Sequence, residues 1–246
     1  MMSSTEMFAR SIFVDADVLS SPLTRTVLLV AAPLGEPDCF HPVWTHEVET
    51  EADRHRRPDQ VPIAGVREQR WGDEFIVPDA SSEDVAALVD TNPKDRHVLA
   101  AAHAAGASVV VTRNVRHFGR GDLARLRMDA AHPDAFLAAV LTPRVYLEAL
   151  QVIAQSRHRA PDTPEALHAA LGRDHPRLFA AMQALFPHGV PIASVHDLPH
   201  EVFRGDRCLV CGAMLTDPEA LESGVGPQCR DKGGQGDQEV TKSVTK

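Results

Sequence analysis

Three acidic residues, Asp15, Glu47 and Asp95, lie far apart in the sequence, each near a place where a predicted sheet could gather them. Carboxylate oxygens are the ligands that Mg²⁺ prefers, and a bound divalent cation can activate water and stabilise the charge that develops on a phosphodiester. Carboxylates crowded together without a cation would repel one another. The three acids therefore predict a divalent metal site if the fold brings them together.

Each of these acids also has a purely structural explanation. Asp95 follows Asn92 by three residues, which approximates a capping box. Asp15 and Asp17 are placed to cap the following helix, and Glu47 is one of several acids on what would be a solvated helix face. Spacing alone leaves both explanations open.

The elements that would position these acids alternate between strands and helices. The expected strands cover residues 11–16, 74–78 and 108–112, and the expected helices cover residues 22–32, 41–56, 82–90 and 93–105. Ser82 and Asn92 are the expected caps of the last two helices, and Gly106 is the expected stop. The alternation indicates a parallel sheet covered on both faces, in which function gathers at the carboxyl ends of the strands.

Composition limits the class of protein. With 43% hydrophobic residues the chain can form a core, and no apolar run of about 18 residues suggests a membrane span. The N-terminal residues show no secretory signal, so we expect a cytoplasmic protein. The formal net charge of −9 argues against broad electrostatic binding of nucleic acid but leaves room for a local basic patch.

Four segments carry a resemblance to a known family, over roughly residues 11–141. They are FVDADVLSSPLTRTVLL, WTHEVETEADR, NPKDRHVLAAAHAAGASVVVTRNVRHF and HPDAFLAAVL, and together they resemble PIN-domain proteins of the VapC-like toxin kind. The resemblance implies a metal-dependent ribonuclease with a three-layer α/β/α fold around a central parallel sheet. It also implies roles for five residues: Asp15, Glu47 and Asp95 would hold Mg²⁺ or Mn²⁺, and Thr112 and Asn114 would line the catalytic pocket.

One position departs from the family's pattern. Relatives often carry Asp three residues after the Asn of TRN, and here that residue is His117. The loss of a carboxylate would weaken a second metal ion, although an imidazole can ligate Mn²⁺ or Zn²⁺. Asp17, where many relatives carry Asn or Ser, is a candidate to compensate. Basic residues follow, and they suit either an RNA backbone or a solvated surface: Arg113, Arg116, Arg120, Arg125 and Arg127.

The chain beyond residue 141 divides by composition. Residues 142–189 form a predicted helical extension, residues 205–231 a small cysteine-rich module, and residues 232–246 a tail expected to be disordered. Cys208, Cys211 and Cys229 predict structural Zn²⁺ and resemble a short zinc-ribbon-like module. The fourth ligand stays open among His196, His200, Asp206 and Asp217. Free thiols and a redox pair are the alternatives, and Cys39 is expected to be a buried apolar residue.

Two classes of function follow from these features. The first is an endoribonuclease acting as the toxin of a toxin–antitoxin pair, with RNA as substrate, an antitoxin protein as partner and a homodimer expected from the family. The second is a PIN-fold module weakened in catalysis by His117 that binds nucleic acid or protein. Cleavage of DNA is a further alternative, because only contacts to the 2′-hydroxyl distinguish the sugars.

Overall fold

A five-stranded sheet lies at the centre of the computed structural model, which describes residues 11–35, 40–54, 56, 60–70, 72–186, 203–204 and 220. The strand order is β2-β1-β3-β4-β5. Four strands are parallel: β1 (Ser11–Val14), β2 (His41–Val43), β3 (Val109–Val111) and β4 (Asp129–Ala131). The fifth, β5 (Phe203–Arg204), pairs antiparallel with β4.

The central strands are short runs of branched and aromatic residues because helices cover them on both faces. Every residue of β3 is buried, as are Ile12, Phe13 and Val14 in β1. A strand that is buried on both faces has a continuous hydrophobic sequence rather than an alternating one. The register pairs Val14 with Val111, so β1 and β3 end side by side.

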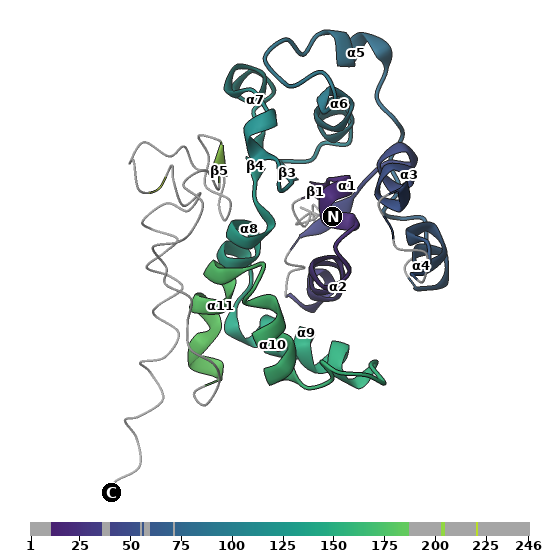
Figure 1. Cartoon of the computed structure of the whole chain (residues 1–246). Helices are drawn as coiled ribbons and strands as arrows, with labels where there is room; N and C mark the ends of the chain where they lie inside the picture. Colours follow the sequence, from purple (N-terminus) through teal and green to yellow (C-terminus); the bar gives the residue numbers. More distant parts are fainter. Residues whose placement is uncertain are drawn as a thin grey trace, which may run out of the picture.

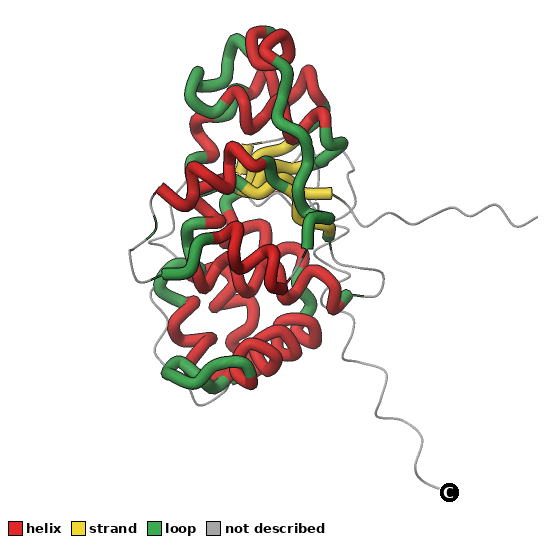
Figure 2. Tube along the Cα trace, turned by 90° about the vertical axis from the view of Figure 1, so that its right-hand side faces the viewer, coloured by secondary structure: helices red, strands yellow, loops and turns green. Residues whose placement is uncertain are grey.

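Helices lie on both sides of this sheet (Figures 1 and 2). The helices of residues 11–141 are α1 (Ala16–Leu19), α2 (Pro22–Ala31), α3 (His46–Arg54), α4 (Ile63–Arg70), α5 (Ser82–Ala86), α6 (Arg96–Ala104), α7 (Arg120–Leu126) and α8 (Pro133–Val140), with the 3-10 turns η1 (Ala32–Leu34) and η2 (Val115–His117). Figure 1 shows α6 and α7 on one side and α2 and α8 on the other. The predicted three-layer α/β/α fold is confirmed.

The helices expected after Thr142 are present as α9 (Pro143–Gln155), α10 (Pro164–Leu171) and α11 (Pro176–Met182), followed by η3 (Gln183–Leu185). Helix α9 packs on α2, and α11 packs on α8. Thr142 and Thr163 cap α9 and α10, each followed by a proline at the first helical position. Within the described residues no single helix could cross a membrane, and α8 and α9 meet the length and composition requirement only as a pair bent by 115°.

Two expected elements at the edge of the sheet are wrong. Residues 74–78 form no strand and contribute a single bridge between Trp44 and Ile76. The strand beside β1 is β2, in a stretch predicted to be helical from residue 41. Val43 and Trp44 are buried there, and the helical spacing of Val48 and Ala52 does not extend so far upstream.

The predicted caps of two helices are each displaced. Ser81, rather than Ser82, caps α5 by accepting the N–H of Asp84. Asn92 does not cap α6, because its side chain accepts the N–H of Lys94 and forms a turn before the helix begins at Arg96. Gly106 has the positive φ (69°) expected of a helix stop.

Candidate active site

Asp15 lies at the carboxyl end of β1, buried to 5% exposure. Its N–H donates to the carbonyl of Val111 at 3.1 Å, so the ladder between β1 and β3 continues to this residue. One carboxylate oxygen accepts the N–H of Ala16 at 2.7 Å, and the other accepts the hydroxyl of Thr112, also at 2.7 Å. The capping role is therefore real, and it coexists with a contact to the end of the neighbouring strand.

Asp17 organises the polar residues that follow β3. Its two oxygens accept the backbone N–H of Arg113 at 3.1 and 3.0 Å, and Oδ2 accepts the side-chain amide of Asn114 at 3.0 Å. The backbone N–H of Asn114 in turn donates to Thr112 Oγ1 at 3.0 Å. From the sequence, Asp17 was only a candidate to compensate for the acid that His117 replaces. The feature that pointed to it was its position two residues after Asp15, directly after a strand.

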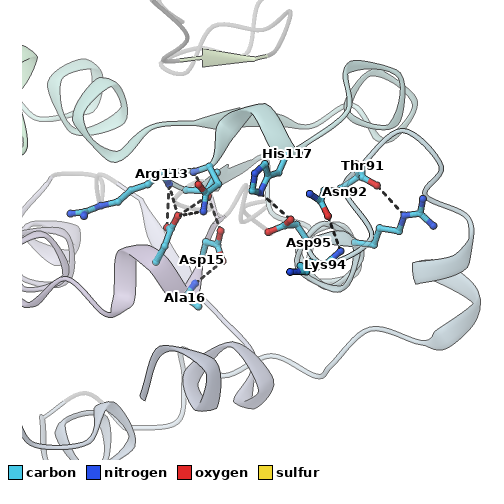
Figure 3. A network of polar contacts seen from close by, with 12 residues as sticks. Asp15, Ala16, Thr91, Asn92, Lys94, Asp95, Arg113 and His117 are labelled. Atoms are coloured by element: carbon cyan, nitrogen blue, oxygen red, sulfur yellow. Dashed lines mark hydrogen bonds and ion pairs between the residues drawn. The ribbon is translucent and has the colours of Figure 1, made fainter. Parts of the chain in front are cut away.

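Asp95 stands at the first position before α6, but its side chain forms no capping hydrogen bond. Its Oδ2 lies 3.2 Å from Nδ1 of His117, at ion-pair distance. Figure 3 shows the imidazole pointing toward this carboxylate, with Asp15 between this pair and Arg113. The backbone N–H of Asn92 donates to the carbonyl of His117 at 2.8 Å, so the capping box considered for Asp95 does not form.

The loop before Asp95 is held by Asp122, a residue that no sequence pattern singled out. The buried carboxylate of Asp122 accepts the N–H groups of Val89, Asp90 and Thr91 at 3.3, 2.9 and 2.8 Å. Burial alone would raise the pKa of Asp122, but hydrogen bonds from Thr91 and Arg125 hold it below its usual value.

A glycine completes this contact between the loop and α7. A Cβ on Gly119 would lie 2.3 Å from Cβ of Asp90 and 2.5 Å from its carbonyl carbon. Backbone can approach this closely only where there is no side chain. In the sequence, the glycines of HFGRGD are the feature that indicates this close contact with the loop before Asp95.

Glu47 lies on α3 with an exposed side chain. Its backbone N–H donates to Asp79 at 3.4 Å, and no interaction within the described residues joins its carboxylate to Asp15 or Asp95. Glu51, one turn later, lies 3.8 Å from His97 of α6. Because residues four apart share a helix face, Glu47 lies on the side of α3 that faces α6.

The neighbouring acids of α3 have structural partners instead. Glu49 is buried and pairs with Arg67 of α4 at 2.9 Å, and Asp53 accepts the N–H of Ile63 at 2.9 Å. These pairs fasten α4 to α3. The description of this stretch as a solvated acidic face is therefore wrong for Glu49 and Asp53.

Burial and mutual repulsion set the electrostatics of the cluster. Burial, followed by the charge of Asp17, raises the pKa of Asp15 to about 7, against the lowering effect of the Thr112 and Ala16 hydrogen bonds. Burial also raises the pKa of Asp17, although the N–H and the charge of Arg113 oppose it. The charge of Asp95 raises the pKa of both residues. The three carboxylates thus lie within electrostatic reach of one another.

The chemistry of these donors fits a hard divalent cation. Oxygen ligands that repel one another in a buried place are stabilised by a cation, which would lower the raised pKa values. Across the described ranges, however, no three His, Cys, Asp or Glu side chains are already arranged so that they could hold one ion. A cation would therefore require these side chains to move closer together.

The basic residues that follow β3 do not all serve one purpose. Arg125 donates to the carbonyl of Ala87 at 2.9 Å and pairs with Asp122 at 3.1 Å, so it has a structural role. Arg113 donates to Ser21 Oγ at 3.0 Å. The remaining three side chains are exposed, at Arg116, Arg120 and Arg127.

Several predicted residues lie outside the described part of the chain. They are Cys39, the zinc ligands Cys208, Cys211 and Cys229, and the four candidate fourth ligands; within residues 205–246 only Ala220 is described. The zinc module and the disordered tail therefore remain predictions, as do the domain boundaries.

Comparisons with known proteins give two partial similarities. A family of unknown function, DUF6011, matches residues 201–234, which include the three clustered cysteines and β5. VapC50 of Mycobacterium tuberculosis, which is named as a candidate ribonuclease, is 39% identical over 112 residues. That match covers 44% of this chain and 65% of VapC50, less than two thirds of its length. No solved structure matches this chain.

Proposed function

We propose that this chain is a metal-dependent endoribonuclease of the VapC-like PIN-domain family. The observation that carries the proposal is the convergence of Asp15, Asp17 and Asp95 with Thr112 and Asn114 at the carboxyl edge of the parallel sheet. The similarity to VapC50 supports RNA as the substrate. The α/β fold alone would not, since one fold serves many activities.

Asp15, Glu47 and Asp95 are the proposed ligands, with Asp17 close enough to contribute charge. A Mg²⁺ or Mn²⁺ ion held there would supply an activated water and stabilise the charge on the phosphodiester. The chain's own residues orient the donors: Thr112 fixes one oxygen of Asp15, and Ala16 fixes the other. Such fixed orientation lowers the cost of reaching the reactive geometry.

Thr112 and Asn114 have defined parts in this proposal. Thr112 donates its hydroxyl proton to Asp15 and accepts the N–H of Asn114, so it links the two strand ends. Asn114 donates its side-chain amide to Asp17, which leaves its carbonyl oxygen available as an acceptor. Both residues therefore hold the carboxylates in place and add neutral polar groups beside them.

The biological setting belongs to the same proposal. The chain acts as the toxin of a toxin–antitoxin pair in the cytoplasm, a small antitoxin protein covers the acidic cluster, and the active form is a homodimer. Structural Zn²⁺ on Cys208, Cys211 and Cys229 would stabilise the C-terminal module. Mass spectrometry of the intact protein with and without a chelator tests the zinc content.

A second function is favoured by one observation, the pairing of His117 with Asp95. An imidazole this close to Oδ2 of the carboxylate occupies space beside it and competes with a cation. In this alternative the chain binds nucleic acid or protein through the PIN fold but cuts RNA slowly or not at all. The two functions differ in whether bound RNA is cleaved.

The experiment that separates them is cleavage of labelled tRNA and unstructured RNA by the purified full chain in Mg²⁺ or Mn²⁺. We expect metal-dependent cleavage that EDTA abolishes and that Asp95→Asn reduces by at least about 100-fold. Asp162→Asn, an exposed residue far along the chain, is the matched control and should cut like the wild type. RNA that is bound but left intact by the wild type would favour the binding module instead.

A further inference from the structure

Three side chains with hydrogen-bond donors lie beside the acidic cluster, with the two guanidinium groups within electrostatic reach of the imidazole. Arg113 and His132 follow the ends of β3 and β4, and those ends are joined by the bond from Thr112 N to the carbonyl of Ala131 at 2.9 Å. Arg177 lies in the first turn of α11, in the helical extension. The three side chains come from separate segments that converge at one edge of the sheet.

Asp134 connects His132 with Arg177. Its backbone N–H donates to Nδ1 of His132 at 3.2 Å, and its side-chain oxygens accept the backbone N–H groups of Arg177 at 3.2 Å and Leu178 at 3.0 Å. Both oxygens of this buried carboxylate are thus occupied by backbone donors. Asp134 fixes the start of α11 against α8 without pairing with the guanidinium of Arg177.

Thr24 connects Arg113 with the same helix from the other side. Its hydroxyl lies 2.8 Å from Nε2 of His175, which is 1% exposed, and 2.9 Å from the hydroxyl of Ser21. The Nη2 of Arg113 donates to Ser21 Oγ at 3.0 Å and lies 3.5 Å from Thr24 Oγ1. Ser21 and Thr24, at the start of α2, therefore hold the Arg113 side chain, and Thr24 links them to His175 of the helical extension.

This cluster has more hydrogen-bond donors than acceptors, although the charges of Asp17 and Asp134 lie within electrostatic reach of Arg113 and Arg177. Among the described residues no carboxylate pairs with the guanidinium of Arg113 or Arg177, and Nε of Arg177 and Nδ1 of His175 are buried without a hydrogen-bond partner. Because His132 accepts a bond at Nδ1, its proton lies on Nε2, a further donor. Burial and the charges of Arg113 and Arg177 lower the pKa of His132 to about 4.

We propose that Arg113, His132 and Arg177 bind a phosphate group of the RNA backbone adjacent to the one that is cleaved. The inference rests on the proposed ribonuclease function. Phosphate oxygens accept several hydrogen bonds at once, and the guanidinium fork matches them. Asp17 holds the backbone of Arg113, so the phosphate site is continuous with the acidic cluster, and the extension supplies part of the substrate surface through Arg177.

The test measures binding and cleavage of one fluorescein-labelled single-stranded RNA by the full chain. Binding is followed by anisotropy in EDTA over a range of salt concentrations, for the wild type, Arg177→Gln, Arg177→Lys and the charge-matched control Arg157→Gln, an exposed residue. We expect Arg177→Gln to weaken binding by about tenfold and to reduce the salt slope by about 0.7, the value for one phosphate contact on a single strand. Arg177→Lys should keep the slope.

Cleavage kinetics in Mn²⁺ provide the second readout. Arg177→Gln should raise KM and leave kcat unchanged, because the contact is made equally in the ground and transition states. If the wild type cuts RNA and Arg177→Gln matches Arg157→Gln in slope and KM, the phosphate site is refuted while the ribonuclease stands. If the wild type cuts no RNA, the proposed ribonuclease function is contradicted. If duplex DNA also binds more tightly than this RNA in the anisotropy measurement, the phosphate site is contradicted as well.

Discussion

The imidazole of His117 lies 3.2 Å from the carboxylate of Asp95, at a position where the PIN-domain pattern that this sequence resembles often has an acid. The pair joins η2 to the start of α6, and a backbone bond from Asn92 to His117 reinforces it. A carboxylate at this position would add to the repulsion among Asp15, Asp17 and Asp95, whereas histidine adds no negative charge. This residue therefore adjusts how strongly the cluster requires a cation.

Restoring an acid at this position should strengthen metal binding. His117→Asp is expected to tighten Mn²⁺ binding by about tenfold, because it adds a hard oxygen ligand, and to lower the melting temperature in EDTA, because it adds a like charge. Calorimetric titration and thermal unfolding measure the two effects. His103→Asp, at an exposed position on α6, is the control, and equal behaviour of the two variants would contradict a role for His117 at the metal.

The raised pKa of Asp15 predicts that the protein is less stable at higher pH when metal is absent. The folded state holds this proton up to about pH 7, whereas the unfolded value is 3.8, so the stabilising contribution is complete below about pH 4 and is lost as pH rises through 7. Urea unfolding in EDTA between pH 5 and 8 should show a steeper decline for the wild type than for Asp15→Asn. Parallel declines would mean that Asp15 titrates normally.

The buried histidines beside α11 predict the opposite dependence at lower pH. Burial lowers the pKa of His175 to about 3 and that of His132 to about 4, both below the ordinary 6.5. The stability due to their neutral forms is present above pH 6.5 and is lost as pH falls through 4 and then 3. His175→Gln should flatten the loss of stability between pH 6 and 4. An unchanged acid unfolding curve would show that protonation of His175 is not involved.

Gly119→Ala should reduce both stability and cleavage. The added methyl group would meet the backbone of Asp90 in the loop that leads to Asp95, at a cost of about 1–3 kcal/mol. Gly106→Ala is the comparison, because its φ of 69° makes alanine costly by about 1 kcal/mol although nothing lies near its Cβ position. Urea unfolding and RNA cleavage should show that Gly106→Ala lowers stability alone. Equal loss of cleavage in both variants would contradict the positioning role of the loop.

Two substitutions of Asp17 separate its charge from its hydrogen bonds. Asp17→Asn keeps an acceptor for Arg113 and removes a charge, so it should stabilise the protein above pH 7 in EDTA. Asp17→Ala leaves donors of Arg113 and Asn114 unpaired and should cost about 1–3 kcal/mol. Urea unfolding of the two variants measures this difference. Equal stabilities would show that the hydrogen bonds to Asp17 contribute nothing.

The sequence predicts best what depends on local pattern. The buried runs of β1 and β3 identified the strand ends, and with them Asp15, Thr112 and Asn114. Prediction from the sequence failed where long-range contacts decide the structure. Residues 41–43 form a strand because they pair with β1, and the side chain of Asp95 lies against His117 instead of capping α6. Asp122 and the Arg113–His132–Arg177 cluster depend on contacts between segments far apart in the chain, so no local spacing indicates them.

The antiparallel pairing of β5 with β4 connects the part of the chain that matches DUF6011 with the central sheet. The segment that matches DUF6011 starts at residue 201, and two of its residues, Phe203 and Arg204, add a strand to the sheet that carries the acidic cluster. Figure 1 shows this short strand at the sheet edge beside β4. Removing the segment that matches DUF6011 would therefore also remove a strand of this sheet, so we expect the two parts of the chain to depend on each other for stability.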